Sequence, residues 1–177
     1  MANSQYVFCP LCGAKLEEQA RHGAVRGVCP TCGFIHFADP KVAVIGLVHH
    51  QGRVLLAKRA VDPAKGKWAL PGGFMDAVEM PEAALSRELM EEVGMAIQVE
   101  RLLGIFPMTG HGPVSRGIVL AYLVRPSQDP PPVLAAMDDI DAVGWFAPKE
   151  LPGELAFAST RTLLDLFEAN LRSDNGR

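Results

Sequence analysis

The sequence predicts an α/β domain preceded by a small cysteine-rich segment. All four cysteines of the 177-residue chain lie in two near-identical C-P-x-C-G turns, at residues 9–13 and 29–33. From residue 41 onward, runs of β-branched and apolar residues bounded by glycine and proline are typical of strands. Residues 81–93 and 159–171 have the apolar spacing of helices. A chain of this length can build one core and a small appendage.

The cysteine-rich segment has the spacing of a zinc site. Sixteen residues separate Cys12 from Cys29, and each C-P-x-C-G turn lets two thiolates point at one ion. Disulfides are the alternative, but they need an oxidising compartment, and the opening MANSQYVFCP lacks an export signal. His22 is expected to be a solvated loop residue rather than a ligand. We expect one structural Zn2+ held by Cys9, Cys12, Cys29 and Cys32.

The first elements of the α/β domain are predicted to form a hairpin. Residues 41–48 and 53–58 are the predicted strands, joined by a short glycine-containing turn. His49 and His50 are expected to flank this turn and face solvent rather than bind a metal. Arg59 follows the second strand, where it can meet a phosphate or remain ordinary surface charge. Further strands are predicted at residues 97–106, 117–124 and 143–146.

An acidic helix is predicted between Pro81, which suits a first helical turn, and Gly94, which suits a terminator. Its packing face is predicted to comprise Leu85, Leu89, Met90 and Val93. Another face gathers the carboxylates of Glu88, Glu91 and Glu92. Like charges at these spacings repel by roughly 0.2–0.5 kcal/mol per pair, and Arg87 alone cannot neutralise three of them. Because Mg2+ prefers carboxylate oxygens, the helix is interpreted as half of a metal site.

The end of the chain is predicted to be helical. Residues 148–151 are expected to form a short turn of helix. Residues 159–171 are predicted to form an amphipathic helix capped by Ser159. Its apolar face comprises Leu163, Leu164, Phe167 and Leu171.

Residues 73–95 carry the pattern G-x5-E-x7-R-E-U-x-E-E-x-G-U, where U is a bulky apolar residue. Its fixed positions are Gly73, Glu79, Arg87, Glu88, Leu89, Glu91, Glu92, Gly94 and Met95. This pattern resembles the signature of the Nudix hydrolases, and we call these residues the box. The resemblance implies an α/β/α sandwich with a mixed sheet at residues 38–177, behind a zinc ribbon at residues 1–37. It also implies Mg2+- or Mn2+-dependent hydrolysis of a nucleoside diphosphate linked to a further group.

The resemblance also implies roles for individual residues. The metal ligands would be Glu88, Glu91, Glu92 and the carbonyl of Gly72. Glu79 and Arg87 would pair and hold the loop on the helix. The general base would be Glu88, Glu91 or Asp139, although Asp138, Asp139 and Asp141 are equally compatible with a solvated loop. We expect substrate contacts from Arg59, Gly73 and Phe106. Val78 stands where relatives often have glycine, and Met80 where they often have a capping serine.

The substrate is less sharply indicated than the reaction. The ribbon followed directly by the first strand is similar to zinc-ribbon Nudix enzymes that act on ADP-ribose and FAD. The layout also resembles NADH pyrophosphatases, but their S-Q-P-W-P-F-P stretch is absent after Met95. Three further activities stay open: removal of nucleoside triphosphates, decapping of RNA 5′ ends, and non-catalytic nucleotide sensing. The glycine- and proline-rich loop at 107–113, with His111, is expected to shape specificity.

Composition limits the partners. The net charge of −3 provides no general attraction for nucleic acid, so a nucleotide would be held by metal and local cations. No run of 18 apolar residues is present. We expect a cytoplasmic enzyme with a small nucleotide substrate and neither a membrane nor a nucleic-acid partner, and a homodimer remains open.

Overall fold

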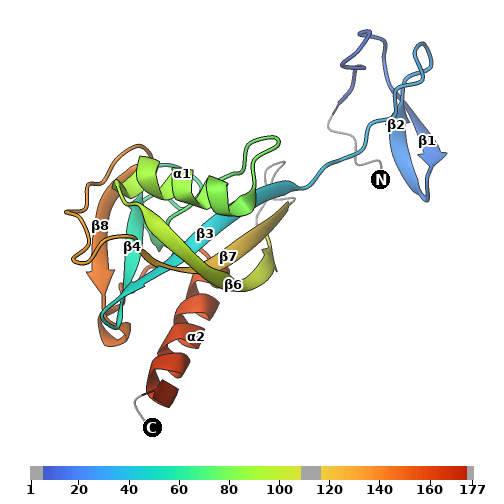
Figure 1. Ribbon diagram of the computed structural model, residues 1–177. Coiled ribbons are helices and arrows are strands. Elements are labelled where there is room, and N and C mark those ends of the chain that lie inside the picture. Colours follow the sequence, from blue (N-terminus) through green and yellow to red (C-terminus); the bar gives the residue numbers. More distant parts are fainter. Residues whose placement is uncertain (1–5, 109–116, 175–177) are drawn as a thin grey trace. The chain divides into compact units, whose positions relative to one another are not determined.

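The computed structural model describes residues 6–108 and 117–174, with side chains to residue 169. The described residues divide into two compact units, 6–41 in the first and 42–108 with 117–174 in the second (Figure 1). No helix among these residues is both long and apolar enough to cross a membrane. His111 lies outside the described residues.

The first unit is a two-stranded hairpin with two cysteine turns. Strands β1 (Glu17–Arg21) and β2 (Ala24–Val28) pair antiparallel around His22 and Gly23, whose φ angles are 48° and 77°. Positive φ at both central positions matches the twist of a two-residue hairpin turn. His22 therefore occupies a turn, as expected from the sequence.

The second unit contains a six-stranded sheet of order β5-β4-β3-β7-β6, with β8 also paired to β4. The pairs β3–β4, β4–β5, β4–β8 and β6–β7 are antiparallel, and Trp68 forms a parallel bridge with Leu155, so the sheet is mixed. The strands are β3 (Lys41–His50), β4 (Arg53–Arg59), β5 (Trp68–Ala69), β6 (Ile97–Pro107), β7 (Gly117–Pro126) and β8 (Ile140–Phe146).

Helices cover both faces of this sheet (Figure 1). On one face, α1 (Pro81–Val93) buries Leu85 and Leu89 against Val44, Val48 and Leu55. On the other face, α2 (Ala158–Asp174) buries apolar side chains against alternate residues of β3 and β4, in a cluster that includes Leu163, Leu164, Leu47, Val54 and Leu56. Adjacent residues of β3 and β4 therefore pack against opposite helices, because successive side chains of a strand point to opposite faces of the sheet. The predicted α/β/α arrangement is confirmed.

Three local predictions were wrong. His49 and His50 flank the turn of Gln51 and Gly52 as expected, but both belong to β3 and are half-buried instead of facing solvent; the φ angles of Gln51 and Gly52 are 47° and 71°. Met90 is 47% exposed, because it lies about 100° round the helix from Leu89, beyond the buried stripe. Ser159 lies inside α2, which begins at Ala158, and therefore is not its cap. The 3-10 turn η2 (Pro148–Glu150) matches the predicted short helical turn.

Candidate active site

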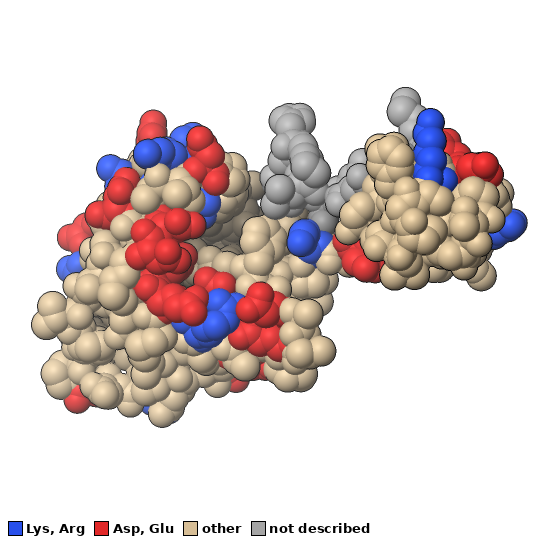
Figure 2. Space-filling model, turned by 90° about the horizontal axis from the view of Figure 1, so that it is seen from above, with Lys and Arg blue, Asp and Glu red and all other residues tan. Residues whose placement is uncertain are grey.

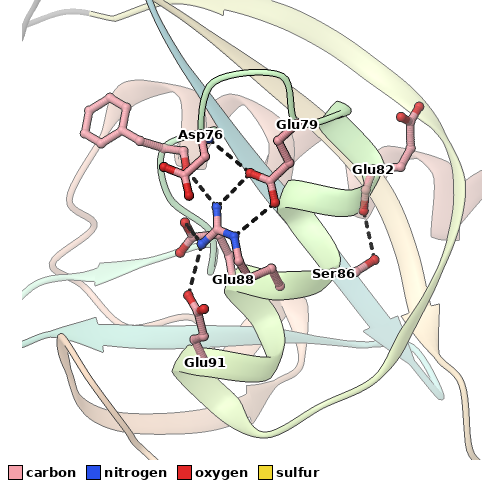
Figure 3. Close-up of polar contacts among 8 residues, drawn as sticks. Asp76, Glu79, Glu82, Ser86, Glu88 and Glu91 are labelled. Carbon is pink, nitrogen blue, oxygen red and sulfur yellow. Dashed lines mark hydrogen bonds and ion pairs between the residues drawn. The ribbon is translucent and has the colours of Figure 1, made fainter.

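Arg87 connects the loop before α1 to the acidic face of the helix through Glu79, Glu88 and Glu91, which are labelled in Figure 3. Its Nε and Nη2 donate to the two carboxylate oxygens of Glu79, each at 3.0 Å. Its Nη1 donates to Glu88 Oε1 at 2.9 Å and to Glu91 Oε2 at 3.0 Å, and Nη2 also donates to the Phe74 carbonyl at 3.1 Å. The predicted pairing of Glu79 with Arg87 is therefore present, and it fixes the loop on the helix.

The same network shifts the protonation of its members. The hydrogen bonds from Arg87 and from the Asp76 amide hold the pKa of Glu79 below its ordinary value. The pKa of Arg87 is raised, chiefly by its hydrogen bonds to Glu79. Burial raises the pKa of Glu88, although Arg87 opposes the shift. Both partners of the loop–helix connection therefore stay charged at neutral pH.

Glu92 is the buried member of the acidic face. Its side chain is 7% exposed, and its Oε2 accepts a hydrogen bond from the Gly72 amide at 2.9 Å. Burial raises the pKa of Glu92 to about 7, and the like charges of Glu88 and Asp138 add to the shift. A carboxylate that water reaches so poorly gains strongly from a nearby cation.

Two glycines let the loop approach β3 and the helix. The loop pairs with β3 through bonds from the Val44 amide to the Gly73 carbonyl and from the Gly46 amide to the Pro71 carbonyl, both at 2.9 Å. Gly72 has φ of 136°, and a Cβ there would lie 2.1 Å from the Val44 carbonyl oxygen. A Cβ on Gly73 would lie 2.5 Å from Glu88 Oε2. No other residue type fits at either position without displacing its neighbours.

The donor set fits a hard divalent cation. Glu88, Glu91 and Glu92 offer carboxylate oxygens beside a loop whose backbone comes close to them, and Mg2+ or Mn2+ takes such ligands. Their oxygens are not gathered within 4.8 Å of one another, a condition that only the four cysteines meet among the described residues. Arg87 holds Glu88 and Glu91, whereas Glu92 is bound to the Gly72 amide. Figure 2 shows acidic side chains gathered around basic ones on the face that carries α1.

A second acidic loop is tied to the same region. The Met137 amide donates to the Glu92 backbone carbonyl at 3.0 Å, and the Ala60 amide donates to the Asp139 carbonyl at 2.7 Å. Asp138, with φ of 50°, is the residue of this loop whose charge affects Glu92. Asp139, the loop residue predicted as a base, is exposed beside it. The resemblance indicated Asp139, whereas the fold shows that the charge of the neighbouring Asp138 is the one that acts on Glu92.

The predicted substrate contacts lie in different surroundings. Arg59 is half-buried at the end of β4, and its charge lowers the pKa of Glu92. Phe106 packs against the apolar cluster on the α2 side of the sheet, and its role as a substrate contact stays a prediction. Gly73 lies directly against the carboxylate of Glu88.

The four cysteines of the first unit form a compact cluster with no disulfide. Their sulfur atoms all lie within 4.8 Å of one another, with Cys12 and Cys29 at 3.4 Å and Cys9 and Cys32 at 3.6 Å. A tetrahedral Zn2+ with bonds of about 2.3 Å spaces sulfurs by roughly 3.8 Å, so the cluster fits zinc. The Cys32 amide donates to Cys29 Sγ at 3.5 Å and lowers the pKa of that thiol to about 6. The cluster is consistent with the predicted zinc ribbon.

Comparison with known proteins agrees with this geometry. Residues 38–167 match the family model described as NUDIX domain. The chain is 33% identical over 129 residues to an ADP-ribose pyrophosphatase of Methanocaldococcus jannaschii, a match that covers 73% of this chain and 74% of the relative. It is 28% identical over 150 residues to the NAD-capped RNA hydrolase NudC of Chromobacterium violaceum, but spans only 52% of that protein.

A solved structure supports the same assignment. A NUDIX hydrolase from Nitrosomonas europaea superposes with a TM-score of 0.81 at 27% identity, over 92% of this chain and 91% of that chain. The family model, the relatives and the box geometry agree, and this chain therefore belongs to the Nudix hydrolase family.

Proposed function

We propose that the enzyme hydrolyses the pyrophosphate linkage of a nucleoside diphosphate joined to a second group, with ADP-ribose or FAD as the leading substrates. The observation that carries this proposal is the loop–helix site, in which Arg87 binds Glu88 and Glu91 while Glu92 accepts from the Gly72 amide of the adjoining turn. Such a site concentrates negative charge that only a cation offsets, next to a backbone that a phosphate can approach.

We assign the metal to Glu88, Glu91, Glu92 and the Gly72 carbonyl. When bound, Mg2+ or Mn2+ neutralises phosphoryl charge and lowers the pKa of a coordinated water. The Glu79–Arg87 pair holds the loop in a fixed position on the helix. Glu88, Glu91 or the loop carboxylate Asp139 would accept the proton of the attacking water.

The relatives support the substrate class. The Methanocaldococcus jannaschii relative is named an ADP-ribose pyrophosphatase, and the chain covers 74% of its length. A second candidate is the 5′ end of NAD-capped RNA, favoured by the similarity to NudC proteins and by the four-cysteine cluster. The absence of S-Q-P-W-P-F-P from the sequence and the partial coverage of those relatives favour the first candidate.

Product analysis tests the proposal. Purified enzyme with Mg2+ is incubated with ADP-ribose, FAD, NADH, NAD-capped RNA and deoxynucleoside triphosphates, and Glu91→Gln serves as the inactive control. We expect AMP and ribose 5-phosphate from ADP-ribose at the highest kcat/KM. If the capped RNA or a triphosphate is the better substrate, the first candidate is wrong. If wild type cleaves none of them and Glu91→Gln binds nucleotide equally well, the hydrolytic proposal itself fails.

We further propose that the ribbon, residues 1–37, holds one structural Zn2+ and that residues 38–177 form the catalytic domain. A four-cysteine zinc site needs reduced thiols, which supports a cytoplasmic location. Zinc content of one equivalent per chain, measured by elemental analysis, is the expected result.

A further inference from the structure

Arg59 is the last residue of β4 and is held by two groups of its own chain. Its Nε donates to the Pro63 carbonyl at 2.8 Å, and its guanidinium carbon lies 5.5 Å from the centre of the Phe157 ring. This separation is within the range of a cation–π contact. Among the described residues, Arg59 has no carboxylate within 4.0 Å and no hydrogen bond at either Nη nitrogen.

Arg87 shows what a purely structural arginine does in this site. Each of its three nitrogens donates to box carboxylates or to a loop carbonyl. Arg59, by contrast, makes no hydrogen bond from its two Nη groups to the residues that the structure describes, and its charge also acts on Glu92. A planar guanidinium with two available donors matches the oxygens of a phosphate.

The backbone around Arg59 fixes the Pro63 carbonyl. The loop from Ala60 to Lys67 is closed by bonds from the Arg59 amide to the Lys67 carbonyl at 3.0 Å and from the Gly66 amide to the Arg59 carbonyl at 2.8 Å. The Ala60 amide is also bound to Asp139. The Pro63 carbonyl, which accepts from Arg59 Nε, therefore belongs to a loop whose two ends are hydrogen-bonded to each other.

Phe157 is positioned from both sides. The Ala156 amide donates to the Trp68 carbonyl at 2.8 Å, and the Trp68 amide donates to the Glu154 carbonyl at 3.0 Å, so the segment before α2 is paired with β5. The Phe157 carbonyl accepts from the Arg161 amide in the first turn of α2. Since Trp68 pairs with Lys58 of β4, the Phe157 ring reaches Arg59 across β5.

We propose that Arg59 binds the substrate phosphate that becomes the leaving group, and that Phe157 is the residue that positions its guanidinium. The inference rests on the proposed pyrophosphate hydrolysis. In that reaction the hydroxyl of water bonds to one phosphorus, and the bridging oxygen leaves with its electron pair on the other phosphate. A guanidinium on that second phosphate stabilises the developing charge. Phe157 acts only through Arg59 and touches no reacting atom.

A double-mutant cycle tests the link between the two residues. The variants are Arg59→Ala, Phe157→Leu, the double variant and Phe157→Tyr, each assayed for kcat and KM with ADP-ribose and Mg2+. Binding of α,β-methylene-ADP, a non-hydrolysable diphosphate, is measured by calorimetry as a readout other than turnover. Leu155→Val, in the same segment but outside the contact, is the control for general loosening, and thermal unfolding is followed for all variants.

We expect Arg59→Ala to lower kcat/KM by about 10- to 100-fold, as for the loss of a charge-assisted hydrogen bond. Phe157→Leu should lower kcat/KM by about 3- to 10-fold, but should have no further effect when Arg59 is already alanine. Phe157→Tyr should restore most of the loss, since it keeps the aromatic face. Leu155→Val should alter Tm without coupling to Arg59.

Additive effects of Phe157→Leu and Arg59→Ala would overturn the positioning role, as would a Phe157→Tyr variant as impaired as Phe157→Leu. Unchanged binding and kcat/KM in Arg59→Ala would overturn the phosphate contact. These outcomes differ from failure of the proposed function, in which wild type itself would neither bind α,β-methylene-ADP nor cleave ADP-ribose.

Discussion

Val78 has a backbone conformation that its side chain disfavours. Its φ is 64°, in the left-handed region that β-branched residues rarely adopt, and its side chain is 106% exposed. The left-handed conformation costs roughly 1–2 kcal/mol for a residue with a Cβ. An exposed side chain gains nothing from packing in return. The positive φ gives a physical reason for the glycine that Nudix hydrolases often have at this position.

Val78→Gly is therefore expected to raise the free energy of unfolding by about 0.5–1 kcal/mol, since the greater entropy of unfolded glycine offsets part of the relief. Urea unfolding of wild type and Val78→Gly measures this difference in the free energy of unfolding. Ala77→Gly, at the neighbouring exposed position without positive φ, should instead lower the free energy of unfolding by a similar amount. A stability loss in both variants would show that Val78 is not strained.

Glu92 makes stability depend on pH. Its folded pKa of about 7 lies above the ordinary value of 4.5, so between these values the folded state binds a proton that the unfolded state lacks. The stabilising contribution of protonated Glu92 to the free energy of unfolding is therefore present at low pH and is lost as pH rises through about 7. In Mg2+-free buffer, Glu92→Gln should gain stability over wild type between about pH 5 and about pH 8, by on the order of 1–3 kcal/mol.

Urea unfolding at several pH values checks this, with the exposed Glu154→Gln as control. With Mg2+ present, the same Glu92→Gln change should lower turnover by orders of magnitude, because it removes a proposed ligand. A pH-independent difference would mean that Glu92 titrates normally, and unfolding of the variant would mean that the acidic face is structural.

At the scale of elements, α1 and the loop before it act as one part of the site. The helix starts at Pro81 after Met80, which provides no side-chain cap, and ends at Gly94, with φ of 67°. The loop is attached to the helix by Arg87 and by the close approach of Gly73 to Glu88. The loop–helix geometry therefore depends on side chains that are also close to the proposed chemistry.

Gly73→Ala tests that geometry. The added Cβ would lie 2.5 Å from Glu88 Oε2, so the carboxylate must move. A displacement of about 1 Å at a catalytic site can cost roughly 100-fold in rate, and we expect a loss of that order in kcat. Gly153→Ala is the matched control, because a Cβ there meets nothing within 4 Å. Steady-state kinetics measure kcat for both variants. Equal kcat in Gly73→Ala and Gly153→Ala would show that the position of the Glu88 carboxylate does not matter for turnover.

At the scale of the molecule, the two units have different sources of stability. The larger unit buries two apolar clusters, one on each face of its sheet. The ribbon has a small hairpin and its cysteine turns, and we propose that a segment of this size depends for its folding on a Zn2+ bound by the four cysteines. Loss of the zinc site should therefore affect one unit and spare the other.

Cys29→Ser is expected to abolish stoichiometric zinc and to unfold the ribbon, while the amide resonances of the larger unit stay dispersed. Elemental analysis and two-dimensional NMR measure the two effects. Thr31→Ser, an exposed position in the same turn, should keep full zinc. Retention of one zinc per chain in Cys29→Ser would refute the four-cysteine site.

Much of this protein follows from local sequence. The cysteine spacing, the box, the β3–β4 hairpin and the limits of α1 depend on turns and periodicities within a few residues, and the structure confirms these elements. The errors at Met90, Ser159, His49 and His50 have a different origin. Burial depends on what packs across the sheet, and the position of a helix start or turn depends on contacts that local propensity does not include.

The sequence by itself determined the family, the acidic helix and the cysteine cluster, because each is encoded by residue types at short, fixed spacings. Only the tertiary structure decided that Glu92 is buried, that the charge of Asp138 acts on it, and that Arg59 is held by Phe157. These relations join residues separated by 46 to 98 positions, such as Glu92 with Asp138 and Arg59 with Phe157. Strand pairing and layer packing bring such residues together, and no local pattern records them.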